Sequence, residues 1–163
     1  MGGDYRFCPR CGSALVPAVA GSCVRAACPD TGCGFVHWDN PVPVVAALVE
    51  LDGRIVLARN VAWPEKVFGL VTGYLERDEA PEGAVAREVA EELGLSATGV
   101  ALIGLYPFAA KNQLLIAYHV RAAGMVTLNE ELAEYRLIEP ERLKAWDFGT
   151  GPAVRDWLAA RGA

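Results

Sequence analysis

The sequence predicts an α/β layered domain behind a small cysteine-rich segment, and three observations lead to this class. Apolar runs rich in β-branched residues recur along most of the chain and are separated by turn signals. One segment with helical periodicity interrupts these runs, and another ends the chain. All five cysteines precede residue 34. Strands, a central helix, more strands and a terminal helix are typical of layered proteins that combine both elements.

The regular part of the chain begins at Pro41, and most of its expected elements are strands. A buried strand over 42–51 is followed by a second over 51–60, and Asp52-Gly53 between them is a two-residue hairpin signal. Further strand-like runs are expected at 67–76, 97–109, 113–123 and 134–138.

Two helices are expected beside these strands. The first spans about residues 80–93, because Pro81 suits a first turn and Gly94 suits the left-handed position after a last turn. The second is expected at the C-terminus, over 150–161 or 152–161. The pattern of elements alone names no function.

The overall composition excludes several classes of protein. The chain has 163 residues, 53% of them hydrophobic and 21% charged, which suits one packed domain with or without a small appendage. Its net charge of −5 gives no sign of electrostatic capture of nucleic acid or anionic lipid. No secretory signal and no apolar run long enough to cross a bilayer is visible. We therefore expect a cytoplasmic protein with neither a nucleic-acid nor a membrane partner.

Residues 73–95, GYLERDEAPEGAVAREVAEELGL, hold seven acidic and two basic side chains. On a helix, Glu88, Glu91 and Glu92 share an arc about 100° wide that flanks the apolar stripe. Such like charges repel one another, and protonation or a bound divalent cation would relieve the repulsion. Charge and spacing alone leave two interpretations open, which are a metal site and a solvated acidic face.

The order of residues in this segment resembles the signature of the Nudix hydrolases, G-x5-E-x7-R-E-U-x-E-E-x-G-U, in which U is apolar. Its fixed positions are filled by Gly73, Glu79, Arg87, Glu88, Val89, Glu91, Glu92, Gly94 and Leu95. The resemblance implies an α/β/α sandwich with a mixed sheet. It also implies hydrolysis of a nucleoside diphosphate that is linked to another group.

The same resemblance implies a catalytic metal site for Mg²⁺ or Mn²⁺. The backbone carbonyl of Gly73 and the carboxylates of Glu88 and Glu92 resemble the metal ligands of the family, and Glu91 assists them. Oxygen ligands of this kind suit hard divalent cations. The bound ions would bridge the two phosphates and lower the pKa of a bound water.

Two other positions of the signature have a supporting role in this resemblance. Glu79 and Arg87 resemble the pair that fixes the loop onto the helix. The chain departs from many members of the family at Asp78, where a Gly is common. It also departs at Ala80, where a Ser or Thr is common, so we expect a weakly capped helix start.

The cysteines form two pairs that indicate a second metal site. Cys8 and Cys11 are two residues apart, and Cys28 and Cys33 are separated by four. Each pair has Pro after its first Cys and Gly after its second, and four thiolates complete a tetrahedral zinc site. Cys23 is left over. The alternative is five reduced thiols without a ligand.

Residues 5–50 resemble the zinc ribbon that precedes the Nudix domain in NADH-pyrophosphatase-like proteins. The sequence is therefore divided into a zinc ribbon over 1–40 and a Nudix domain over 41–163. The ribbon is expected to be structural, packing on the enzyme domain or at the interface of a homodimer. Its basic and acidic residues balance, which does not favour a nucleic-acid-binding ribbon.

The general base is less certain than the metal ligands. Glu91 or Glu92 is one candidate, and Glu134 matches a position where related enzymes often place an additional glutamate. We prefer Glu134, with Glu130 and Glu131 as rivals. A solvent-facing Glu134 in an acidic loop is the structural alternative.

Several aromatic residues and two histidines are candidates for ligand binding or catalysis, and each also has a structural interpretation. Trp38, Trp63 and Phe68 could stack on a base, although aromatic residues beside strands usually belong to a core. His37 and His119 are isolated in the sequence and are expected to be structural. None of these residues enters the predicted catalytic set.

The predicted function is metal-dependent hydrolysis of a pyrophosphate bond in a small nucleotide such as ADP-ribose, FAD or NADH. NADH pyrophosphatases carry S-Q-P-W-P-F-P-x-S after the signature, and this chain keeps only Pro107-Phe108 of it. Strict NADH specificity is therefore not expected. A nucleotide sensor without turnover and a zinc-ribbon interaction protein are the alternative functions.

Overall fold

The structure is a computed structural model, and it describes residues 5–162. The chain divides into two compact units, Met1–Pro41 and Val42–Ala163. Each unit is described by itself below.

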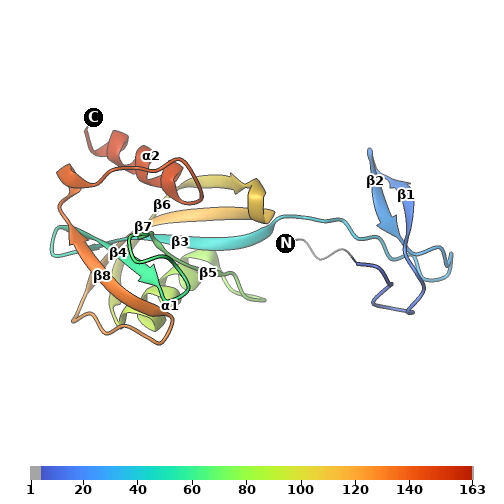
Figure 1. Cartoon of the computed structure of the whole chain (residues 1–163), viewed down its shortest axis with the longest axis horizontal. Helices are drawn as coiled ribbons and strands as arrows, with labels where there is room; N and C mark the ends of the chain where they lie inside the picture. The colour runs from blue at the N-terminus through green and yellow to red at the C-terminus, as the bar shows by residue number, and fades with distance from the viewer. Residues whose placement is uncertain (1–4, 163) are drawn as a thin grey trace. The chain divides into compact units, whose positions relative to one another are not determined.

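The first unit contains a small antiparallel hairpin and the loops around it. Strand β1 (Val16–Ala20) pairs with β2 (Cys23–Ala27), as Figure 1 shows in blue. Gly12 has a φ of 77°, a left-handed conformation that favours glycine and turns the chain after the first cysteine pair. Among its described residues, the apolar side chains that are buried are Cys8 and Ala27.

The second unit is built on a mixed six-stranded sheet. Its strands are β3 (Val42–Leu51), β4 (Arg54–Asn60), β5 (Val71–Tyr74), β6 (Ser96–Phe108), β7 (Gln113–Ala123) and β8 (Leu132–Ile138). Their order is β6-β7-β3-β4-β8, and β5 pairs with the first half of β3. The β3–β7 pair is parallel, and the other pairs are antiparallel.

Helices α1 (Pro81–Leu93) and α2 (Gly151–Arg161) lie on opposite faces of this sheet (Figure 1). Successive residues of β3 point to opposite faces, which produces two packed layers. Val45 and Val49 belong to the cluster that contains the buried face of α1, whereas Leu48 packs with the residues of α2. The arrangement confirms the predicted α/β/α sandwich with a mixed sheet.

Local signals placed several elements correctly. Asp52 and Gly53 have φ angles of 49° and 77°, as a tight two-residue hairpin with a left-handed turn requires. The described chain also contains two short 3₁₀ turns. Turn η1 (Ala109–Lys111) follows β6, and η2 (Pro140–Arg142) follows β8. Within the described part of the chain, no helix is long and apolar enough to cross a membrane.

Helix α1 begins and ends as its sequence indicates. Pro81 occupies its first turn, and Gly94 ends it in a left-handed conformation with a φ of 67°. Ala80 makes no side-chain capping bond, so the start is weakly capped as expected. Asp78 has a φ of 61°, which explains why glycine suits this position well.

One boundary differs from its prediction in a way that affects the site. The strand expected to begin at Glu134 begins at Leu132, so Glu134 lies inside β8 rather than at its mouth. Glu134 is paired with Arg59 in the register of β4 and β8. The backbone pairing with β4 extends the strand over residues that sequence patterning had assigned to a loop.

Candidate functional site

A cavity of about 640 Å³ lies in the second unit, near the start of β3. Its walls come from chain segments around residues 63–70, 72–76, 108–115 and 146–150, together with carboxylates of α1. The cavity is large enough for a small organic ligand. It contains several of the residues that the sequence singled out.

The tightest contact of the cavity joins β5 to α1 at Gly73. A Cβ atom added to Gly73 would lie 1.8 Å from Cδ of Glu88 and 1.9 Å from its Oε1. The carboxylate of Glu88 thus occupies the space that any other residue at position 73 would fill. The glycine of the signature is required here because a helix carboxylate packs directly against the strand at residue 73.

Arg87 holds the acidic side chains of the loop and helix in place. Its Nε and Nη2 donate to the two carboxylate oxygens of Glu79 at 2.8 and 3.0 Å. Its Nη1 donates to Glu88 at 2.8 Å and to Glu91 at 3.0 Å, and Nη2 also reaches the carbonyl of Tyr74 at 3.3 Å. This bidentate geometry fixes the loop before α1 onto the helix.

These contacts also set the charge of the pair. Hydrogen bonding to Arg87 holds the pKa of Glu79 below its usual value. The bonds to Glu79 and then Glu88 raise the pKa of Arg87 above its already high value. Both groups are therefore charged at neutral pH.

Glu92 is the buried charged residue of α1, with 7% of its surface exposed. Burial is the main cause that raises its pKa to about 7, and repulsion by Glu88, Glu131 and Glu91 adds to the shift. Glu92 lines the cavity together with Glu88. The cavity therefore contains a carboxylate whose charge the protein alone does not compensate.

Glu91 does not share this environment. Its side chain is 57% exposed and is paired with Arg87, and it is not among the residues that line the cavity. The three carboxylates share one arc of the helix but differ in environment. Glu88 and Glu92 line the cavity, whereas Glu91 faces outward. Glu88 packs against Gly73 of β5, and the 127–131 segment is bonded to the backbone at Glu92 and Leu93, whereas Glu91 is exposed.

Glu131 is brought to the cavity by a loop that is bonded to the end of α1. The N–H groups of Thr127 and Asn129 donate to the carbonyls of Leu93 and Glu92 at 2.8 and 3.2 Å. The carbonyl of Glu131 accepts from the N–H of Val61 at 2.8 Å. These backbone bonds hold Glu131 in the cavity wall, near Glu92.

Glu134 has a different set of neighbours. Its carboxylate lies 3.8 Å from Nη2 of Arg59 and 3.3 Å from Nη2 of Arg136, and its side chain is 43% exposed. It is not among the residues that line the cavity, and neither is Glu130. Of the three glutamates considered from the sequence, Glu131 is the one that faces the other carboxylates.

Aromatic side chains line the same cavity. Trp63 and Phe68 come from the β4–β5 connection, and the ring of Trp63 lies against Gly69, where an added Cβ would be 3.1 Å away. The guanidinium of Arg136 lies 4.0 Å from the centre of the Phe68 ring. Trp38 belongs to the first unit, where it is half exposed and lies beside Arg25.

The carboxylates and the carbonyl of Gly73 form an oxygen-only donor set, which fits a hard divalent cation. Among residues 5–162, however, these acidic groups do not converge to within 4.8 Å of one another. A cation that keeps several waters and contacts phosphate oxygens needs only one or two carboxylates from the protein. The donor set therefore fits Mg²⁺ or Mn²⁺ bound together with a phosphate ligand.

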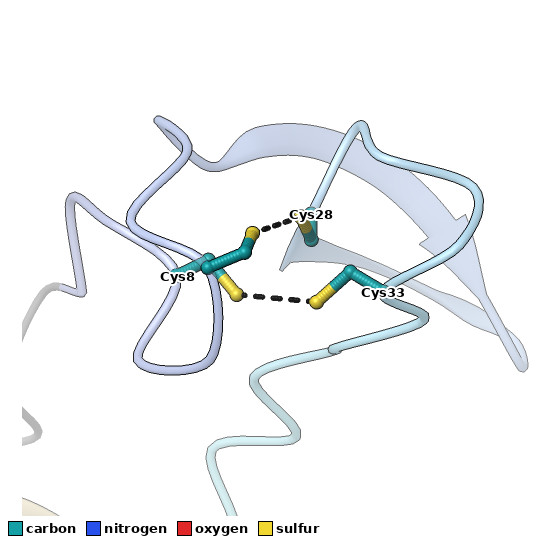
Figure 2. A group of neighbouring side chains, drawn as sticks. Cys8, Cys28 and Cys33 are labelled. Atoms are coloured by element: carbon teal, nitrogen blue, oxygen red, sulfur yellow. Dashed lines mark hydrogen bonds between the residues drawn. The ribbon is translucent and has the colours of Figure 1, made fainter.

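The four predicted cysteines of the first unit lie together. The Sγ atoms of Cys8, Cys11, Cys28 and Cys33 are all within 4.8 Å of one another, with Cys8–Cys33 at 3.5 Å and Cys11–Cys28 at 3.4 Å. Figure 2 shows Cys8, Cys28 and Cys33 pointing toward one another. Tetrahedral zinc with Zn–S bonds of about 2.3 Å has sulfur atoms roughly 3.8 Å apart, so the donor set fits zinc.

The remaining candidates lie outside both groups. Cys23 is exposed at the start of β2, next to Ser22. The ring of His37 lies 4.7 Å from that of Tyr5 in the first unit. His119 contacts Glu50 at 2.7 Å and packs 5.4 Å from the Trp157 ring. Neither histidine lines the cavity.

A mixed sheet between two helices, with the carboxylate of Glu88 on α1 packed against Gly73 of β5, defines the class of this protein. Residues 39–158 match the model of the NUDIX domain. The chain belongs to the NUDIX family, and the family resemblance of the sequence is confirmed.

Curated relatives are similar to this chain over part of their own length. The NAD-capped RNA hydrolase NudC of Stutzerimonas stutzeri (strain A1501) is 32% identical over 145 residues, which are 87% of this chain and 51% of that protein. The NAD-capped RNA hydrolase NudC of Mycobacterium bovis (strain BCG / Pasteur 1173P2) is 43% identical over 79 residues, which are 47% and 25% of the two chains. The chain thus spans about half or less of the length of these relatives.

Solved structures of low sequence identity share the fold. A NUDIX hydrolase from Nitrosomonas europaea superposes with a TM-score of 0.73 at 21% identity, over 94% of this chain and 88% of that one. An ADP-ribose pyrophosphatase from Streptococcus suis 89-1591 has a TM-score of 0.60 at 18% identity, over 76% and 94%.

Proposed function

We propose that this chain is a metal-dependent pyrophosphohydrolase, which cleaves the diphosphate of a nucleoside diphosphate linked to another group. The observation that carries the proposal is the Gly73–Glu88 contact, because it holds a helix carboxylate against a strand glycine and both residues line one cavity. The relatives named as NAD-capped RNA hydrolases also support this chemistry.

In this proposal Glu88, Glu92 and the carbonyl of Gly73 hold the divalent cation. Mg²⁺ or Mn²⁺ supplies charge compensation for the phosphates and a more acidic bound water. Arg87 and Glu79 position Glu88 and do not touch the substrate, because their charged groups are already paired with each other. Glu91 assists the two metal-binding carboxylates from outside the cavity, where Arg87 donates a hydrogen bond to it.

We assign the general base to Glu131 in place of Glu134. Glu131 lines the cavity, whereas Glu134 is held on β8 between two arginines. A glutamate outside the helix that is not a metal ligand keeps its basicity and can accept a proton from the attacking water. The N–H of residue 131 donates to Asn129 at 3.1 Å, which helps to fix the loop that carries this side chain.

For the first unit we propose a structural zinc ribbon over residues 1–40, with zinc on Cys8, Cys11, Cys28 and Cys33. The support is the short spacing of the four Sγ atoms. The Nudix domain then comprises 41–163. A homodimer stays a prediction, which light scattering of the purified chain would test.

The substrate is a small nucleotide in this proposal. ADP-ribose, FAD and NADH all contain the required linkage. The names of the relatives state action on NAD-capped RNA, so the expected absence of a nucleic-acid partner is not supported by them. An NAD-capped RNA therefore belongs in the substrate panel.

Turnover of this panel with Mn²⁺ is the test, using wild type and Glu88→Gln. We expect Glu88→Gln to keep the fold and to lose most of the turnover, since a metal ligand contributes several kcal/mol to the barrier. Glu82→Gln is the matched control, because Glu82 is an exposed acidic residue of the same helix that does not line the cavity. Near-native kcat in Glu88→Gln at saturating metal would refute the ligand assignment.

The same experiment separates the alternative functions. Binding of a nucleotide without turnover by the wild type would identify a sensor. Neither binding nor turnover would favour an interaction protein. Only metal-dependent turnover is consistent with the proposal.

A further inference from the structure

The two edges of the sheet in the second unit differ in charge. Strand β8 forms one edge and β6 forms the other. Edge β8 carries Glu134 and Arg136, charged side chains of the kind that protect a sheet edge from association. Edge β6 belongs to a stretch from Leu93 to Ala110 that contains no charged side chain. The side chains of β6 therefore lack the protection that those of β8 have.

Two leucines of β6 lie on the same face of the sheet because the strand is irregular. Leu102 is opposite Tyr118 of β7. After a register shift, Leu105 is opposite Ile116, which is two residues from Tyr118 and so shares its face. Tyr118 and Ile116 both pack in the apolar cluster that contains α1. Leu102 and Leu105 therefore lie on the α1 face, although a spacing of three residues would separate them in a regular strand.

Helix α1 covers the inner part of this face and leaves the outer strand open. Tyr118, which packs in the α1 cluster, is 3% exposed, whereas Leu102 is 58% and Leu105 is 59% exposed. Pro107, two residues after Leu105 and on the same face, is also exposed. Leu102, Leu105 and Pro107 form an apolar surface, which we call the β6 patch.

The backbone of β6 is poorly suited to pairing with a further strand. Pro107 has no N–H group to donate, and the register of β6 is interrupted near Thr98 and again near Ile103. Proteins use proline and such bulges to prevent strands of other chains from joining a sheet. A partner on this edge would therefore contact the side chains of the β6 patch and would not extend the sheet.

The charge of the chain favours a second copy of it as this partner. In a two-fold symmetric interface a surface meets itself, so a charged side chain near the axis faces the same charge on the other copy. A chain with a net charge of −5 must therefore place such an interface where it has no acidic side chain. The β6 patch meets this condition. Glu82 of α1, which contacts Tyr118, supplies the polar rim that interfaces have around an apolar centre.

We propose that the β6 patch is the interface of a homodimer, in which the patches of two copies pack on each other around a two-fold axis. This assignment places the dimer contact on the second unit and not on the zinc ribbon. It does not depend on the reaction that the cavity performs. Each copy buries Leu102 and Leu105, which the single chain leaves more than half exposed.

Light scattering and sedimentation equilibrium of the full chain, over a range of concentrations, test this interface. Wild type should reach twice the 17.4 kDa mass of one chain. Leu102→Glu and Leu105→Glu should each raise the dissociation constant of the dimer by roughly 100-fold or more, because each brings two like charges into an apolar contact. Circular dichroism should show an unchanged fold, since both side chains are largely exposed in the single chain.

Controls separate the interface from a general effect of added charge. Tyr135→Glu adds the same charge to the opposite edge, at a residue that is 40% exposed, and should dimerise as wild type does. Leu105→Met keeps an apolar side chain of similar volume and should also dimerise. None of these three residues lines the cavity, so turnover by each chain should not change. The mass measurement is therefore independent of the proposed reaction.

Three results would overturn the assignment. The first is a wild type that stays monomeric at the highest concentration tested. The second is a dimer in Leu102→Glu or Leu105→Glu that is as strong as that of wild type. The third is loss of the dimer in Tyr135→Glu to the same extent as in Leu105→Glu. If Cys28→Ser loses the dimer while Leu105→Glu keeps it, the contact belongs to the first unit.

Discussion

In the first unit the four thiols lie in a segment with almost no core, whereas in the second unit the carboxylates lie on a helix with a buried apolar face. Cys8 and Ala27 are the buried apolar residues described in the first unit. By contrast, Val85, Val89 and Leu93 of α1 are completely buried. We expect the first unit, which has almost no core, to depend on the proposed zinc in order to fold, and the second unit to fold on its buried apolar core alone.

The difference explains why the two donor sets have different geometry. The thiols approach one another within 4.8 Å, on two loops whose backbone bonds, such as those of Cys8 to Ser13 and of Cys28 to Phe35, turn all four side chains inward. The carboxylates are held apart by the strand, the helix and the 127–131 loop, each of which has its own backbone bonds. The first arrangement suits a permanent ion, and the second suits an ion that arrives with its substrate.

The largest expected effect concerns the ribbon. Cys28→Ser should abolish zinc binding and unfold the described part of the first unit, because structural zinc contributes on the order of 10 kcal/mol to such units. Metal analysis and limited proteolysis would measure both losses, and the thermal transition of the second unit should remain. Cys23→Ser is the matched control and should retain about one zinc per chain. If the first unit stays folded without zinc, it does not depend on a metal for its fold, and the proposed difference between the two units is wrong.

Glu131→Gln should lower kcat by roughly 10²–10⁴, the usual range for general-base catalysis, with KM little changed. Glu134→Gln is its control, because Glu134 does not line the cavity. Steady-state kinetics across pH at saturating Mg²⁺ would compare the two. If Glu134→Gln loses most of its kcat while Glu131→Gln keeps it, Glu134 is the general base, as the sequence predicted.

Gly73→Ala should lower kcat by about 10², because the added Cβ displaces the Glu88 carboxylate and an error of about 1 Å has this cost. Gly83→Ala is the matched control on α1, since a Cβ there meets nothing within 4 Å. It should stabilise the helix by roughly 0.5–1 kcal/mol and leave turnover unchanged. Normal kinetics in Gly73→Ala would mean that Glu88 can adopt another productive position.

The smallest effect is a pH dependence of stability. The pKa of Glu92 is raised from 4.5 to about 7, so the native state binds this proton more tightly than the unfolded state does. The stability that protonation provides is therefore present at low pH and is lost as pH rises through 7. Glu92→Gln should stabilise the metal-free protein at pH 8 by about 1–3 kcal/mol and have no such effect at pH 4.

Urea unfolding at the two pH values, without divalent ions, would measure this effect. Added Mg²⁺ should stabilise wild type at pH 8 and not Glu92→Gln, because the ion compensates the same charge. If the free energy of unfolding has the same pH dependence in wild type and in Glu92→Gln, protonation of Glu92 does not contribute to stability.

Much of the fold was predictable because its signals are local. Pro81 and Gly94 bound α1 within one residue of the expected range, and Asp52-Gly53 defined the first hairpin of the sheet. The paired pattern of Pro and Gly around the cysteines indicated which four lie together and left Cys23 apart. These features depend on backbone preferences within a few residues, which the sequence expresses directly.

The sequence by itself determined most elements of the second unit, the family signature and the donor types expected at both sites. Only the tertiary structure decided that Glu91 faces outward, that Glu131 rather than Glu134 lines the cavity, and that Phe108 and Phe148 line it together with Trp63. Helical periodicity gives the face of one element, but it does not say which loops cover that face. Those contacts arise from the parallel β3–β7 pairing and the bonds of the 127–131 loop, which join residues far apart in the chain.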